Sequence, residues 1–100
     1  MVRERGRSVQ GKFLRVGVLI PAEGQARVGL ITSKRVGGAV IRNRVRRRLR
    51  EIFRACLPEI ADGRWVVIVA KPPAAEASFE ELRGEWLLLA RRLSILPPLP

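Results

Sequence analysis

Residues 34–55, KRVGGAVIRNRVRRRLREIFRA, constrain the fold of this chain more than any other stretch. Within them, apolar residues recur at helical spacing, and on a wheel of about 100° per residue they occupy a sector of roughly 120°. These apolar residues are Ile41, Val45, Leu49, Ile52, Phe53 and Cys56. A chain with this pattern must form an amphipathic helix and cover its apolar face with other elements. Because Cys56 lies on that face, it is interpreted as a buried, inert thiol.

The opposite face of this helix is positively charged throughout. Arg42, Arg46, Arg50 and Arg54 follow one another at four-residue steps, and Glu51 is the only acid nearby. Like charges at that spacing destabilise a helix by about 0.2–0.5 kcal/mol per pair, so helix stability does not explain the pattern. A phosphate-binding face is favoured over a merely solvated face and over a membrane-surface helix, whose apolar side the core already needs.

Asn43 adds chemical specificity to the basic face. Its amide both donates and accepts, so it can hydrogen-bond a base edge, a ribose hydroxyl or a hydrated metal ion. Ahead of the helix stand Gly37 and Gly38. They either let an anion approach the free amides of the helix N-terminus or only permit the bend from loop to helix, and both readings stay open.

The composition narrows the class of function. A net charge of +11 and a pI near 11.7 predict a polyanionic partner, usually nucleic acid. The chain has no histidine and one cysteine, which excludes disulfides within the chain, mixed-ligand zinc fingers and histidine-based catalysis. No catalytic residue and no metal ligand is therefore assigned to the protein. No apolar run is long enough to span a bilayer, and the N-terminus lacks a signal core, so the prediction is a cytoplasmic protein without a membrane or small-molecule partner.

The remaining elements follow from local patterns. Residues 12–20 and 27–33 are predicted strands, joined by a short Pro- and Gly-containing turn into a hairpin. The basic helix opens at Gly37-Gly38, runs to about Leu57 and is stopped by Pro58. Residues 65–70, WVVIVA, form a continuous β-branched run, as in a strand buried on both faces.

A second helix begins at Ser78, where Ser78 and Glu81 form a capping box. Residues 1–11 are interpreted as an extended arm, and residues 95–100 as an irregular, proline-rich tail. The order β-β-α-β-α predicts a single domain over 1–100, an α/β fold in which helices pack on one small mixed sheet as an α+β two-layer sandwich. The general rule makes its βαβ crossover right-handed.

The motifs together resemble a known family. VGGAVIRNRVRRRLRE, preceded by RVGLITSKR, is similar to the signature of the bacterial ribonuclease P protein subunit, with Arg42-Asn43-Arg44 at its centre. The downstream VVIVAKPPAAEASFEEL resembles the family's strand, K/R-P loop and S/T-F-E-E helix. The resemblance covers roughly residues 6–93, and its elements agree in order and spacing.

The resemblance implies a function. The family protein binds a catalytic RNA and assists its Mg²⁺-dependent, endonucleolytic removal of the 5′ leader from precursor tRNA, so the chain would be part of a hydrolase whose chemistry lies in the RNA. Catalytic RNA and precursor tRNA would be its partners, and Mg²⁺ would act through the RNA. The residues implied in RNA binding are Lys34, Arg35, Arg42, Asn43, Arg44, Arg46, Arg47, Arg50 and Arg54.

The resemblance also implies a left-handed βαβ crossover and a cleft across the sheet for the single-stranded leader. Phe13 is a candidate for lining that cleft, with plain core packing as the alternative. The family usually begins with a short aromatic helix that forms one cleft wall. This sequence starts too late to contain it, so either leader binding is weakened or the start is misassigned. The family commonly has asparagine where this chain has Gly38.

Three other functions fit a basic chain of this size. The main alternative is a ribosomal-type or other structural RNA-binding protein, which would bind RNA without stimulating cleavage. A protein-only nuclease would cut RNA unaided, but the two-metal route needs clustered acids that the sequence does not show. A DNA-binding helix would select duplex DNA.

Overall fold

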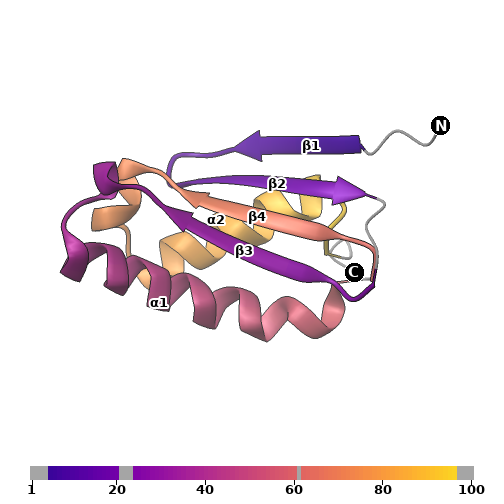
Figure 1. Ribbon diagram of the computed structural model, residues 1–100. Helices are drawn as coiled ribbons and strands as arrows, with labels where there is room; N and C mark the ends of the chain where they lie inside the picture. Colours follow the sequence, from indigo (N-terminus) through magenta and orange to yellow (C-terminus); the bar gives the residue numbers. More distant parts are fainter. Residues whose placement is uncertain (1–4, 21–23, 61, 97–100) are drawn as a thin grey trace.

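The computed structural model describes residues 5–20, 24–60 and 62–96. They form four strands and two long helices, joined in part by single-turn 3-10 helices (Figure 1). The elements are β1 (Arg5–Gln10), β2 (Leu14–Ile20), β3 (Arg27–Thr32), η1 (Lys34–Val36), α1 (Ala39–Cys56), η2 (Leu57–Glu59), β4 (Trp65–Ala70), η3 (Pro72–Glu76) and α2 (Phe79–Arg92). The predicted α+β sandwich, with one mixed sheet and its helices, is confirmed.

The sheet has the strand order β1-β2-β4-β3. β4 is central, antiparallel to β2 and parallel to β3, while β1 pairs antiparallel with β2. The predicted hairpin between residues 12–20 and 27–33 is therefore wrong, because β4 lies between those strands. Residues 24–27 lie beside the turn that leads into β4, where the Gly63 N–H donates to Gly24 O at 3.0 Å and the Arg27 N–H to Arg64 O at 3.1 Å.

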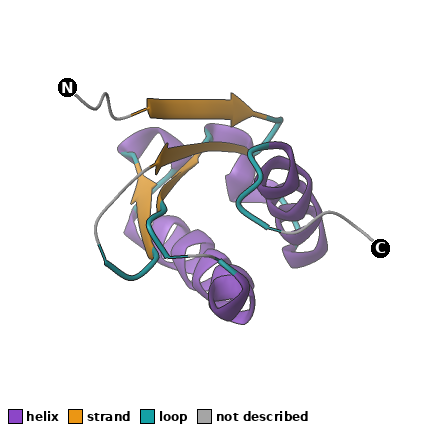
Figure 2. Ribbon diagram, turned by 90° about the vertical axis from the view of Figure 1, so that its right-hand side faces the viewer, coloured by secondary structure: helices purple, strands orange, loops and turns teal. Residues whose placement is uncertain are grey.

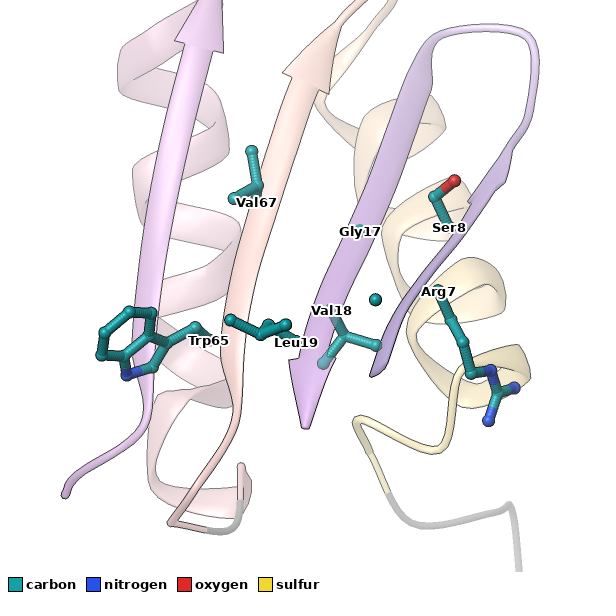
Figure 3. Close-up of a pocket in the computed structure, with 8 residues that line it drawn as sticks. Arg7, Ser8, Gly17, Val18, Leu19, Trp65 and Val67 are labelled. Carbon is teal, nitrogen blue, oxygen red and sulfur yellow. The ribbon is translucent and has the colours of Figure 1, made fainter. Parts of the chain in front are cut away.

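β3, α1 and β4 form the predicted βαβ unit. In Figure 3 both parallel strands point upward, β4 lies to the right of β3, and α1 lies behind the sheet. A chain that moves to the right through a helix behind the sheet makes a left-handed crossover. The hand implied by the family resemblance is therefore the observed one, and the general expectation of a right-handed crossover is wrong here.

The N-terminal segment differs from its prediction. Within the predicted extended arm, Arg5–Gln10 is a strand that pairs with β2, and the Gly11 N–H donates to Leu14 O at 2.8 Å in the turn that leads into β2. Composition hides this strand, because Val9 is its only apolar residue and is half-buried. Of the proline-rich tail, residues 97–100 lie outside the described residues.

Both helices cover one face of the sheet, and the core lies between these two layers (Figure 2). Alternate residues of β4, Val66, Ile68 and Ala70, are buried, and α2 contributes the fully buried Trp86. From α1, Val45, Leu49, Ile52 and Cys56 are buried, while Ile41 and Phe53 are half-buried against the core, as predicted.

The other face of the sheet carries no helix. Trp65 is 38 % exposed and Val67 is 40 % exposed, so the prediction that residues 65–70 are buried on both faces is wrong. Strict alternation of buried and exposed side chains in a strand is typical of a sheet that is packed on one side only.

α2 begins as predicted. The Glu81 N–H donates to Ser78 Oγ at 3.1 Å, and the Ser78 N–H donates to Glu81 Oε1 at 2.9 Å, which completes the capping box. Hydrogen bonding to the Glu81 carboxylate, first from the Ser78 backbone N–H and then from the Ser78 side chain, holds the pKa of that carboxyl below its ordinary value, because it favours the ionised form.

Candidate nucleic-acid interface

The solvent-facing stripe of α1 consists of four exposed polar residues at alternating steps of four and three. They are Asn43, Arg47, Arg50 and Arg54. Eleven residues of helix place the ends of this outer stripe about 16 Å apart, at about 1.5 Å per residue. The first turn of α1 has no acidic residue and the last turn carries Arg54; the exposed Glu51, one turn after Arg47, is the only acidic residue of the helix.

Two arginines on one flank of α1 hold the segment before α2. Arg44 Nη2 donates to Ala75 O at 3.2 Å, and Arg48 Nη1 donates to Ala77 O at 2.8 Å. One helical turn separates these arginines, and their acceptors are carbonyl groups of η3 and of the residue that follows it. Both side chains therefore have a structural use that the charge pattern alone does not reveal.

The other flank of α1 faces β3. Arg46 is half-buried, and its Nε and Nη2 both donate to Thr32 Oγ1, at 3.2 Å and 2.8 Å. The wheel placed Arg46 near the middle of the solvent face; the structure turns it towards the end of β3. Arg42, one turn earlier, is also half-buried.

Lys34 and Arg35 extend the positive surface beyond the helix. Both are exposed on η1, which connects β3 to α1. Gly37 has φ 150° and lies against Ile41, while Gly38 has φ −69° and open space where a side chain would project. Gly37 thus satisfies the backbone bend, whereas an anion at the uncapped N-terminus beside Gly38 stays a prediction.

The open sheet face forms a second surface, with a shallow hollow of about 390 Å³ (Figure 3). The register of β2 and β4 determines which side chains line the hollow, because Gly17 lies beside Val67 and Leu19 lies beside Trp65. The small Gly17 leaves room above the sheet, and Trp65 and Leu19 form an apolar wall. The hollow is lined by Gly6, Arg7, Ser8, Gly17, Val18, Leu19, Trp65 and Val67.

Cations border this open sheet face. The Arg27 guanidinium lies over the Trp65 ring at 5.5 Å from its centroid, and Arg15 is exposed on the same face of β2. Sequence reasoning missed Trp65, because the apolar run around it was read as buried on both sides. A tryptophan at the strand start, two residues after a Gly turn, is the signal that could have marked it.

Phe13 does not line the hollow. It is half-buried just before β2, packs against the core and has the Lys12 ammonium 5.3 Å from its ring centroid. The structure therefore favours core packing for Phe13 over a place in the cleft.

The described residues form neither a metal-binding cluster nor a membrane-spanning helix. Within residues 5–20, 24–60 and 62–96, no three histidine, cysteine or acidic side chains gather into a group that could hold a metal ion. Among the same residues, no helix combines the length and apolar character that a bilayer crossing needs.

A basic helix on one side of the sheet and an open, cation-bordered sheet face on the other (Figure 2) are features of a small α+β protein suited to a polyanionic partner. Residues 1–94 match the family model described as Ribonuclease P. The chain is 49 % identical over 93 residues to the ribonuclease P protein component of Thermus aquaticus, covering 92 % of this chain and 54 % of that one. It is 38 % identical over 96 residues to that of Roseiflexus castenholzii, covering 95 % and 79 %.

Solved structures agree in fold. The RNase P protein of Staphylococcus aureus superposes with a TM-score of 0.79 at 22 % identity, covering 92 % of this chain and 84 % of that one. The RNase P protein of Thermotoga maritima gives 0.74 at 28 % identity, covering 86 % and 83 %. The chain belongs to the ribonuclease P family, as a protein component of that enzyme.

Proposed function

We propose that the protein binds the catalytic RNA of ribonuclease P and precursor tRNA, and assists the RNA-catalysed removal of the tRNA 5′ leader. The observation that carries this proposal is the outer stripe of α1, whose three cations face solvent on a helix with Glu51 as its only acid. These positive charges add little to the stability of the helix, but they raise the affinity of the protein for a polyanion. We assign the outer stripe, with Lys34 and Arg35, to the backbone of the catalytic RNA. A cytoplasmic location is part of the same proposal.

The open sheet face is assigned to the single-stranded leader. Bases stack on aromatic rings regardless of sequence, and Trp65 offers the one large aromatic surface that borders the hollow. Arg15 and Arg27 place positive charge on the strands around it, which suits the phosphates that connect successive bases. A precursor would then contact this face, whereas a mature tRNA, which lacks the leader, would not.

Hydrolysis itself is assigned to the RNA and its Mg²⁺. The described residues bring together no acidic cluster that fits a magnesium site, so no step of the reaction is derived through a protein-held metal. The protein's part is to neutralise phosphates that would otherwise repel one another. A lower Mg²⁺ requirement and a steep salt dependence of binding are the expected consequences.

Cleavage of precursor tRNA by a bacterial ribonuclease P RNA tests the proposal. At low Mg²⁺ the wild-type protein should stimulate leader removal, and the Arg47→Ala/Arg50→Ala double variant should stimulate it much less. Arg83→Ala, which removes an exposed arginine of α2, is the matched control. RNA binding without stimulation would identify a structural RNA-binding protein instead. Cleavage without added RNA would identify a protein nuclease.

A further inference from the structure

The contact between Arg46 and Thr32 differs from the other arginine contacts of α1. Two nitrogens of one guanidinium, Nε and Nη2, donate to a single side-chain hydroxyl, at 3.2 Å and 2.8 Å. Arg44 and Arg48 each use one nitrogen and a backbone carbonyl. A hydroxyl can be removed by substitution without altering any charge, so this contact can be tested in isolation.

Paired donation fixes the direction of the Arg46 side chain. Nε and Nη2 lie on one edge of the planar guanidinium, so their shared acceptor occupies that edge and leaves Nη1 and the second Nη2 hydrogen directed away from Thr32. Both residues are half-buried, which restricts the side chain further. An arginine that is already held in one orientation loses less conformational freedom when it meets a phosphate.

Thr32 occupies the position where such control is useful. It is the last residue of β3 and directly precedes the turn that carries Lys34 and Arg35. Arg42, four residues before Arg46, lies on the same flank of α1. The hydroxyl thus joins the strand that supports the η1 cations to the helix that carries the others.

We propose that Thr32 is a positioning residue of the nucleic-acid interface, which orients Arg46 towards a backbone phosphate of the RNA partner. Thr32 itself is neutral and contacts the RNA only through Arg46. The inference rests on the proposed function, because it takes the RNA as the ligand. Thr32, a neutral residue outside the basic motif of α1, would thereby contribute to RNA binding.

The test compares Thr32→Val with wild type for binding to a ribonuclease P RNA over a range of salt concentrations. Valine keeps the branched shape and β-propensity but cannot accept a hydrogen bond. Loss of one positioned contact should weaken binding by about two- to tenfold. The slope of log K against log salt should stay unchanged, because every cation is retained. Thr32→Ser should bind as wild type does.

Variants at Arg46, combined with Thr32→Val, form a double-mutant cycle. Arg46→Ala should weaken binding and also reduce the salt slope by about 0.7 to 0.9. Arg46→Lys, which keeps the charge but not the paired donors, should bind as weakly as Thr32→Val with the wild-type slope. In the Arg46→Ala background, Thr32→Val should have no further effect, because its only route to the RNA is gone.

Ser33→Ala is the matched control, since this adjacent exposed hydroxyl makes no side-chain cap bond. Thermal unfolding of each variant separates orientation from folding, because a residue needed only for stability would lower Tm without altering RNA affinity. Wild-type affinity in Thr32→Val, or an equal effect of that substitution with and without Arg46, would overturn the inference. If wild type itself failed to bind the RNA, the proposed function would fall instead.

Discussion

The Glu85 carboxylate of α2 accepts the backbone N–H of Leu14 at 2.6 Å, and the N–H groups of Lys12 and Phe13 at 2.7 and 2.8 Å. One side chain thereby satisfies three consecutive amides where the chain enters β2. Gly11 is fitted to this arrangement, because a Cβ there would collide with the Glu85 carboxylate. Lys71, which directly follows β4, supports the same turn, as its Nζ donates to Gly11 O at 2.7 Å.

Replacement of Glu85 should therefore destabilise the fold. In Glu85→Ala, half-buried amides lose a charged acceptor, and the free energy of unfolding should fall by about 2–3 kcal/mol. Urea denaturation measures this change. Glu80→Ala, which removes an exposed carboxylate of the same helix, should have a much smaller effect. Equal effects for the two variants would show that the contact with the turn contributes little.

Gly37 and Gly38 directly precede α1, and alanine substitutions at these two positions should differ in their cost to stability. Gly37→Ala places a Cβ about 3.0 Å from the Ile41 side chain at φ 150°, and should cost about 1–3 kcal/mol of stability. Gly38→Ala meets open space at an ordinary φ and should cost only the few tenths to about 2 kcal/mol of an alanine N-cap. Unfolding measurements rank the two. A larger loss in Gly38→Ala would contradict the assignment of the bend to Gly37.

The outer stripe predicts different roles for charge and amide. Arg50→Ala should lower the salt slope of RNA binding by about 0.7 to 0.9, as expected for one phosphate contact. Asn43→Ala should leave the slope unchanged and still reduce stimulation of cleavage, because an amide reads hydrogen-bonding groups without neutralising charge. Titrations at several salt concentrations, with Arg54→Ala alongside, distinguish them. If the three variants changed the salt slope and the stimulation of cleavage alike, the outer stripe would act only through its charge, and Asn43 would have no specific role.

Trp65 should report on the leader directly. Trp86 is fully buried, so Trp86→Phe leaves Trp65, on the open sheet face, as the only tryptophan. A leader oligonucleotide should change its fluorescence. Trp65→Ala, in the otherwise wild-type protein, should reduce the preference for precursor over mature tRNA by about tenfold, from the loss of one stacking contact of about 1–3 kcal/mol. Leu88→Ala, an exposed apolar residue of α2, is the control.

The capping box predicts a pH dependence of stability. Because hydrogen bonds from Ser78 lower the pKa of Glu81 in the folded protein, its stabilising effect is fully present above the ordinary value of 4.5 and is lost as the pH falls through the folded value. The Tm difference between wild type and Glu81→Gln should therefore shrink from pH 7 to pH 3. A difference that grows on acidification would contradict the sign of the shift.

Local patterns predicted most of the elements, but neither the strand β1 nor how the elements are arranged. The core face of α1, the strand 65–70 and the Ser78 cap follow from spacing and short-range chemistry, and all are observed. The hairpin failed because pairing of β3 with β4 depends on a crossover through α1, which no local signal encodes. The left-handed crossover was anticipated only by family resemblance.

The candidate site shows the same division. Charge spacing identified the basic helix, yet it could not separate Arg50, which faces solvent, from Arg46 and Arg48. That distinction depends on Thr32 Oγ1 and Ala77 O, which approach α1 from other parts of the chain. Trp65 was missed for a related reason, since the number of covered sheet faces is a tertiary property.

β4 separates two kinds of evolutionary constraint along one strand. Its even-numbered residues, Val66, Ile68 and Ala70, meet the core, while Trp65 and Val67 point the other way. A substitution at an odd position alters what the open face can hold without changing the side chains that meet the core. Under the proposed function, leader preference can therefore diverge between related proteins by changes at alternate residues, while the core packing behind those residues stays the same.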